Sequence, residues 1–212
     1  MIKILLFFLI TFNINNCFAF DKKQIRYYEI SNNIKTKEEI LVESAIKKYD
    51  LDIKIKTIKF NNKMKFLFEL QTIKEAEDGD DYYIYFNSAN SKHIQNEYKL
   101  WGQYHITNKI ILINKDIVFK FNKQKQIGVV THEIGHMLGL SHYDDKTCNF
   151  MQGGEDNCQS YDYKQINILK DYINDNLSKG YQEKYMFKDD HYLETIKNLK
   201  RNKTMTLYLV LD

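Results

Sequence analysis

The sequence of 212 residues contains no proline, only eight glycines and a single tryptophan. Without proline, its turns must depend on asparagine, aspartate and glycine. Only three cysteines are present, but a chain of this length can bury a hydrophobic core without disulfide or metal cross-links. We therefore expect one domain of ordinary size, stabilised by packing, with small appendages.

An excess of charge of one sign is also lacking. Lysine and arginine number 31 against 28 acidic residues, which gives a formal net charge of +3, and the basic residues are spread along the whole chain. This even distribution predicts no nucleic-acid partner. The hydrophobic share of 43%, with 13 phenylalanines and 16 tyrosines, is typical of a packed globular protein.

The longest apolar run lies near the N-terminus. Lys3 provides a positive start, residues 4–12 are apolar apart from Thr11, and Cys17 to Ala19 offers small residues for cleavage. This pattern is typical of a secretory signal peptide at residues 1–19, and the run is too short for a transmembrane helix. We predict a secreted or periplasmic protein. Lipid attachment at Cys17 and a buried first strand or helix are the alternatives.

Cleavage of that signal would leave two cysteines, Cys148 and Cys158, in an oxidising compartment. We predict that they form a disulfide bond, which would contribute roughly 2 to 3 kcal/mol by loop-closure entropy. Two buried free thiols are the alternative.

Periodicity predicts an alternation of strands and helices. Thr36 and Glu39 have the spacing of a capping box at the start of the first helix. We expect helices at 37–49, 122–138 and 163–174, and strands at 24–30, 53–60, 65–73, 82–86, 101–106 and 109–114. The strands at 101–106 and 109–114 are predicted to be antiparallel neighbours. The acidic segment 77–81 is interpreted as a solvated turn, with a calcium site as the alternative.

These elements predict three segments: the signal peptide at 1–19, a main domain at 20–178 and a C-terminal extension at 179–212. The extension contains a strand-like run at 205–211, MTLYLVL, to which the sequence assigns no function.

The stretch THEIGHMLGLSH, residues 131–142, contains three of the six histidines. His132 and His136 are four residues apart, so on a helix both imidazoles lie on one face and can bind one metal ion. His142 could join them only if the helix ended first, since six further residues turn it away from that face. Gly139 is placed to end the helix, because glycine adopts a positive φ without a steric penalty.

Three neutral imidazoles leave one position open on a tetrahedral Zn²⁺ ion, which is the arrangement of a catalytic site. Glu133 could then act as general base toward a zinc-activated water. The five fixed positions of H-E-x-x-H-x-x-G-x-x-H would arise by chance in roughly one such sequence in a hundred thousand. An amphipathic helix with surface histidines is the alternative.

At these residues the sequence resembles the metzincin clan of zinc metalloproteases, whose histidine motif is followed by a methionine turn. Met151, in CNFMQGG, stands nine residues after His142. The resemblance implies that His132, His136 and His142 bind zinc, that Glu133 is the base and that Met151 lies beneath the metal. It is strong over residues 109–151 only.

The resemblance also implies a fold class, an α/β (α+β) zincin. Its mixed, mainly parallel five-stranded sheet would have an antiparallel edge strand at 101–106 that binds extended substrate. Two main helices, the methionine turn and a C-terminal helix complete it, and a Cys148–Cys158 bond would brace the turn. Two residues depart from the pattern. Tyr143 follows the third histidine, so no subfamily is assigned, and Gly153 stands where some families have a tyrosine ligand.

We therefore predict a secreted zinc-dependent endopeptidase, acting as a monomer on protein or peptide substrates. A catalytically inactive zinc-binding or adhesive module is the alternative. A zincin whose third ligand is a glutamate would have to use Glu155 or Glu183, and His142 makes this unnecessary. The remaining histidines, His93, His105 and His191, are isolated in the sequence, which favours surface or core roles.

Overall fold

The computed structural model describes residues 28–29, 35–59, 81–87, 100–106, 109–143, 148–152, 158, 161–175, 186, 195–197, 199–200 and 204–211. Several predicted features lie outside these residues. They are the signal peptide with Cys17, the strand at 65–73, most of the acidic turn, and Gly153, Glu155, Glu183, His93 and His191. No helix among the described residues is long and apolar enough to cross a membrane.

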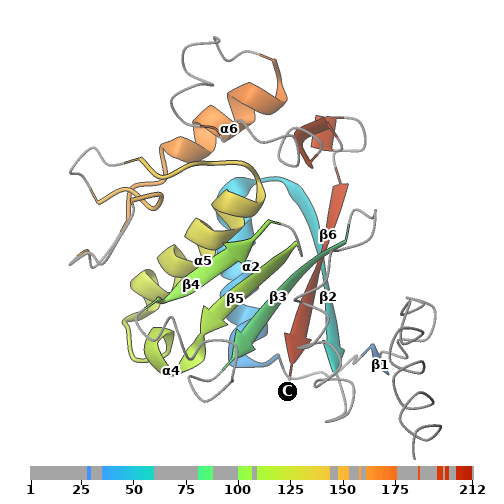
Figure 1. The fold of residues 1–212 in the computed structure, drawn as a ribbon, viewed down its shortest axis with the longest axis vertical. Coiled ribbons are helices and arrows are strands. Elements are labelled where there is room, and N and C mark those ends of the chain that lie inside the picture. The colour runs from blue at the N-terminus through green and yellow to red at the C-terminus, as the bar shows by residue number, and fades with distance from the viewer. Residues whose placement is uncertain are drawn as a thin grey trace, which may run out of the picture.

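The described strands form one mixed sheet in the order β1-β2-β6-β3-β5-β4 (Figure 1). The four middle strands run parallel, whereas the edge strands β1 and β4 are antiparallel to their neighbours. Five of the strands have four to eight residues, and β1 has two. Their bounds are Tyr28–Glu29 (β1), Asp52–Lys59 (β2), Asp81–Asn87 (β3), Gly102–His105 (β4), Ile110–Asn114 (β5) and Thr204–Leu211 (β6). The predicted mainly parallel sheet with an antiparallel edge strand is confirmed, but the described sheet has six strands instead of the predicted five, because the C-terminal strand β6 pairs between β2 and β3.

Strand β6 lies in the middle of this sheet, between β2 and β3. Its register with β2 runs from Asp52 opposite Thr204 to Lys59 opposite Leu211. The run at 205–211 is thus a strand, as predicted. The division of the chain at residue 178 stays a prediction, but a cut there would remove the strand that β2 and β3 both pair with.

Two long helices, α2 (Lys37–Tyr49) and α5 (Lys123–Met137), pack against each other over one face of the sheet (Figure 1). The predicted capping box is present, with the Thr36 side chain accepting a hydrogen bond from the Glu39 N–H. Asn122 caps α5 in a similar way by accepting from the Lys125 N–H at 2.9 Å. The predicted helix at 163–174 is α6 (Gln165–Ile173). The short helix α4 (Lys115–Val118) was not predicted.

Strand side chains alternate between two apolar clusters. On β5, Ile111 and Ile113 face α2 and α5 and are fully buried in the main core. Leu112 faces the other side, against a smaller cluster of Ile58, Tyr85 and Val210. The main core therefore lies between the helices and the sheet, and α5 carries the THEIGH segment across it.

Candidate metal centre

Helix α5 ends at the position that the sequence predicts. Gly139 has a φ of 95°, in the left-handed region. Its N–H donates to the His136 carbonyl and the Leu140 N–H donates to the Gly135 carbonyl, both at 2.9 Å. These two bonds form a Schellman motif, which satisfies carbonyl groups that a helix end leaves unpaired. The chain reverses here, and His142 returns toward the last turns of α5.

The three motif histidines converge in the structure. The Nε2 atom of His142 lies 3.2 Å from that of His132 and 3.0 Å from that of His136. All their candidate ligand atoms lie within 4.8 Å of one another, and among the described residues only these three histidines form a cluster that could hold a metal ion. His105 lies apart from them on β4.

Two backbone carbonyls fix the orientation of the helical imidazoles. The Nδ1 atom of His132 lies 2.6 Å from the Phe150 carbonyl oxygen, and that of His136 lies 2.8 Å from the Leu140 oxygen. Since a carbonyl oxygen can only accept, each Nδ1 carries the proton and each Nε2 keeps its lone pair. Such outer partners are the usual means by which proteins orient histidine ligands.

Burial keeps these imidazoles uncharged. Burial, with a smaller contribution from the neighbouring imidazoles, lowers the pKa of His132 to about 4 and that of His136 to about 3. The hydrogen bonds to the Phe150 and Leu140 carbonyls oppose the shift. Burial also lowers the pKa of His142. At neutral pH all three rings are therefore neutral donors, and a metal ion need not displace protons to bind.

The segment around Met151 packs directly under α5. Met151 is fully buried, and a Cβ atom added at Gly135 would lie 2.5 Å from its sulfur. The absence of a side chain at Gly135, between the two helical histidines, therefore lets Met151 approach the helix backbone. The Tyr143 N–H donates to the Met151 carbonyl at 3.0 Å, which ties this segment to the loop carrying His142.

A disulfide bond joins Cys148 to Cys158, with a Cα–Cα distance of 5.7 Å. The Cys148 carbonyl accepts from the Asp162 N–H at 2.6 Å, and the Phe150 N–H donates to the Asp162 carbonyl at 3.0 Å. Cys148 thus lies two residues before Phe150, whose carbonyl group orients His132. The backbone of Asp162, just ahead of α6, holds the segment from Cys148 to Phe150 in place.

Glu133 is buried beside the edge strand. Burial raises the pKa of its carboxyl to about 8, and a hydrogen bond from the Tyr104 backbone N–H opposes the shift. Its Oε2 atom is buried with no hydrogen-bond partner in the part of the chain that the structure describes. An unpaired buried carboxylate oxygen is costly unless a further group satisfies it. Three neutral nitrogen donors, two of them on the helix that also carries such an oxygen, fit a divalent metal ion together with a water molecule.

Four supporting groups were not predicted from the sequence: the carbonyls of Leu140 and Phe150, the space at Gly135 and the Tyr104 N–H. Backbone groups leave no side-chain signature, so the sequence could not reveal them. One signal was available in Gly102, because glycine inside a strand often marks a close approach.

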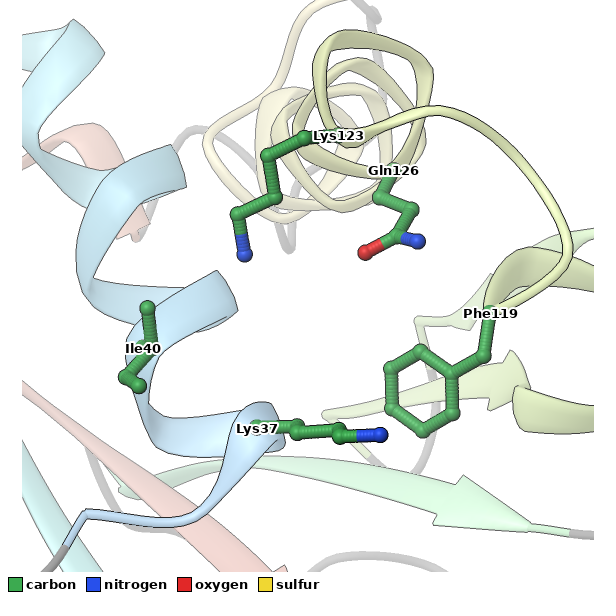
Figure 2. Close-up of a pocket in the computed structure, with 5 residues that line it drawn as sticks. All are labelled: Lys37, Ile40, Phe119, Lys123 and Gln126. Carbon is green, nitrogen blue, oxygen red and sulfur yellow. The ribbon is translucent and has the colours of Figure 1, made fainter.

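A cavity of about 300 Å³ lies at the opposite end of α5, near the start of α2 (Figure 2). It is lined by Lys37, Ile40, Phe119, Lys123 and Gln126. Neither a motif histidine nor Glu133 belongs to this lining, so the cavity and the histidine cluster are separate features.

Comparison of the chain with protein-family models, with curated proteins and with solved structures finds no match.

Proposed function

We propose that the protein is a secreted zinc metalloendopeptidase of the metzincin type. The observation that carries this proposal is the convergence of three neutral imidazoles at the end of a helix that also carries a buried carboxylate. A structural zinc site has four protein ligands, whereas three histidines leave one position open. The chemistry of the donor set therefore favours a catalytic site.

His132, His136 and His142 would hold the ion through their Nε2 atoms. When bound, zinc lowers the pKa of water and polarises the scissile carbonyl group. The protein's own contribution is to keep the imidazoles neutral and correctly turned, through burial and the carbonyls of Phe150 and Leu140.

Glu133 is the proposed general base. Its unpartnered Oε2 atom can accept the proton of the attacking water, and the carboxyl can then deliver that proton to the leaving amine. A carboxyl group in an exposed position has a pKa near 4.5 and would release the proton too readily to carry it. Burial raises the pKa of Glu133 to about 8 in the metal-free protein, so the carboxyl group would hold the transferred proton, and a divalent ion bound nearby would favour the ionised form that accepts it.

The proposed substrate is a protein or peptide lying extended along β4. Two observations support this placement. Strand β4 is the last strand of the described sheet, and its Tyr104 N–H contacts the Glu133 carboxylate directly. An edge strand offers backbone groups that an extended peptide can pair with. The disulfide supports the proposed export, since such bonds persist in oxidising compartments.

The test is a digest of a peptide library by the purified protein from residue 20 onward, with and without a chelator, beside Glu133→Ala. We expect cleavage by the wild type alone, and its recovery when zinc is restored. Cleavage that survives both the chelator and the substitution would refute the mechanism. One bound zinc per chain without any cleavage would instead support an inactive zinc-binding module.

A further inference from the structure

Gly102 is the first residue of the edge strand β4 and pairs there with Ile113, although strands are generally poor in glycine. A paired strand residue gains from a side chain that packs, and glycine loses more conformational entropy on folding than any other residue. Backbone conformation does not require glycine here, because Gly139 is the one glycine with a positive φ among the described residues. The reason for Gly102 must therefore lie in its surroundings.

Those surroundings are the side chain of Glu133. A Cβ atom added at Gly102 would lie 2.7 Å from the Glu133 Cγ, 2.8 Å from its Oε1 and 3.0 Å from its Cδ. All three of these contacts involve one side chain, and that side chain is buried. Any residue other than glycine at 102 would therefore have to move the Glu133 carboxylate.

Strand β4 also supplies a hydrogen bond to the same carboxylate. The Asn114 N–H donates to the Trp101 carbonyl, and the register places Gly102 opposite Ile113 and Tyr104 opposite Ile111. Because bonded and non-bonded pairs alternate in an antiparallel ladder, the backbone groups of residues 102 and 104 point away from β5. The Tyr104 N–H accordingly reaches Glu133.

We propose that Gly102 and the Tyr104 N–H are positioning groups for Glu133. This inference rests on the proposed function, because it explains how the general base is aimed. The missing side chain at 102 leaves room for the Glu133 carboxylate. The Tyr104 N–H holds the carboxylate there, and Oε2 stays without a partner, so that it can accept the proton of the water. One strand would then align both the extended substrate and the base, which fixes the distance between the scissile bond and the proton acceptor.

Gly102→Ala tests the positioning role. We expect kcat to fall by about 10- to 100-fold, a large part of what a general base contributes. KM should change less than about twofold, and one zinc should still bind per chain. Lys120→Ala, an exposed change in the turn after α4, is the control and should leave kcat unchanged. A larger KM with an unchanged kcat would show that Gly102 serves substrate pairing alone and would overturn the proposal.

A thermal double-mutant cycle tests the contact without any activity measurement. Gly102→Ala should lower Tm in the wild-type background, because the added methyl group displaces Glu133. In the Glu133→Ala background the same change should raise Tm by about 1 to 3 °C, as glycine-to-alanine changes do at unstrained positions. Equal Tm changes in both backgrounds would refute the contact. If the wild type cleaves no peptide, the proposed function fails, but this cycle still decides whether β4 positions Glu133.

Discussion

The two ends of α5 differ in how their side chains are held. At the C-terminal end, the Nδ1 atoms of His132 and His136 are both paired with backbone carbonyls, and the rings converge within a few ångströms. At the N-terminal end, Lys37 and Lys123 extend as exposed side chains around the cavity of Figure 2, beside an Ile40 that is 44% exposed.

This difference shows that the presence of a cavity does not by itself identify a functional site. The cavity is a defined hollow, but its lining includes the exposed side chains of Lys37, Ile40 and Lys123. At the histidine end, the Met151 segment and β4 both support the groups on α5. A catalytic site requires side chains fixed in this way, because small displacements of reacting groups cost large factors in rate.

The largest expected effect is on zinc affinity, which should fall after a change at the histidine end of α5 but not after a change at the cavity end. His136→Ala should lower zinc affinity by more than about 100-fold, since loss of an outer partner alone typically costs 10- to 100-fold. Competition against a chromogenic chelator measures this affinity. Lys123→Ala, on the same helix, is the control and should bind zinc like the wild type. Full zinc affinity in His136→Ala would remove this histidine from the site.

A smaller effect should follow from opening the disulfide at the histidine end. The double change Cys148→Ser with Cys158→Ser should lower the free energy of unfolding by about 2 to 3 kcal/mol, because the unfolded chain gains entropy. Urea denaturation measures this loss, and reduction of the wild type should reproduce it. An unchanged midpoint would mean that the bond does not support the Met151 segment.

The pH dependence of stability should reveal the contribution of the buried Glu133 carboxyl group. Its pKa is about 8 in the folded protein against 4.5 when exposed, so the folded state binds the proton more tightly. The contribution of this group to the free energy of unfolding is fully present below about pH 4.5 and is lost as the pH rises toward 8. Without metal, the Tm advantage of Glu133→Gln over the wild type should therefore grow between pH 5 and 8.

His132 and His136, whose folded pKa values are lowered, act in the opposite sense and destabilise the protein below about pH 6.5. The difference between wild type and Glu133→Gln cancels this histidine contribution. A difference that stays constant with pH, measured by thermal scans in chelator, would contradict the raised pKa of Glu133.

The smallest effect is expected at the cavity. Lys37→Ala combined with Lys123→Ala should change the free energy of unfolding by less than about 0.5 kcal/mol, as exposed substitutions usually do. Peptide cleavage should also be unchanged. A clear loss of kcat in this double variant would show that the two ends of α5 are functionally coupled.

The candidate site was more predictable from the sequence than the sheet. Residues at 132–142 are close in the chain, so helical spacing and one glycine at 139 are enough to bring three histidines together. The role of the Met151 segment was implied by the resemblance of its position to a metzincin methionine turn. Strand pairing, in contrast, depends on contacts between distant segments, and nothing in MTLYLVL indicates which strands it joins. Its place between β2 and β3 was therefore not predicted.

The position of β6 also determines when, during synthesis of the chain, the metal site can form. Sixty-nine residues separate His142 from Leu211, and a ribosome needs roughly 3 to 14 s to add them at 5 to 20 residues per second. During that interval the histidines exist, but the sheet beneath α5 has no middle strand. We expect nascent chains arrested before residue 204 to capture no zinc. Metal binding would thus have to wait for synthesis of the C-terminal strand.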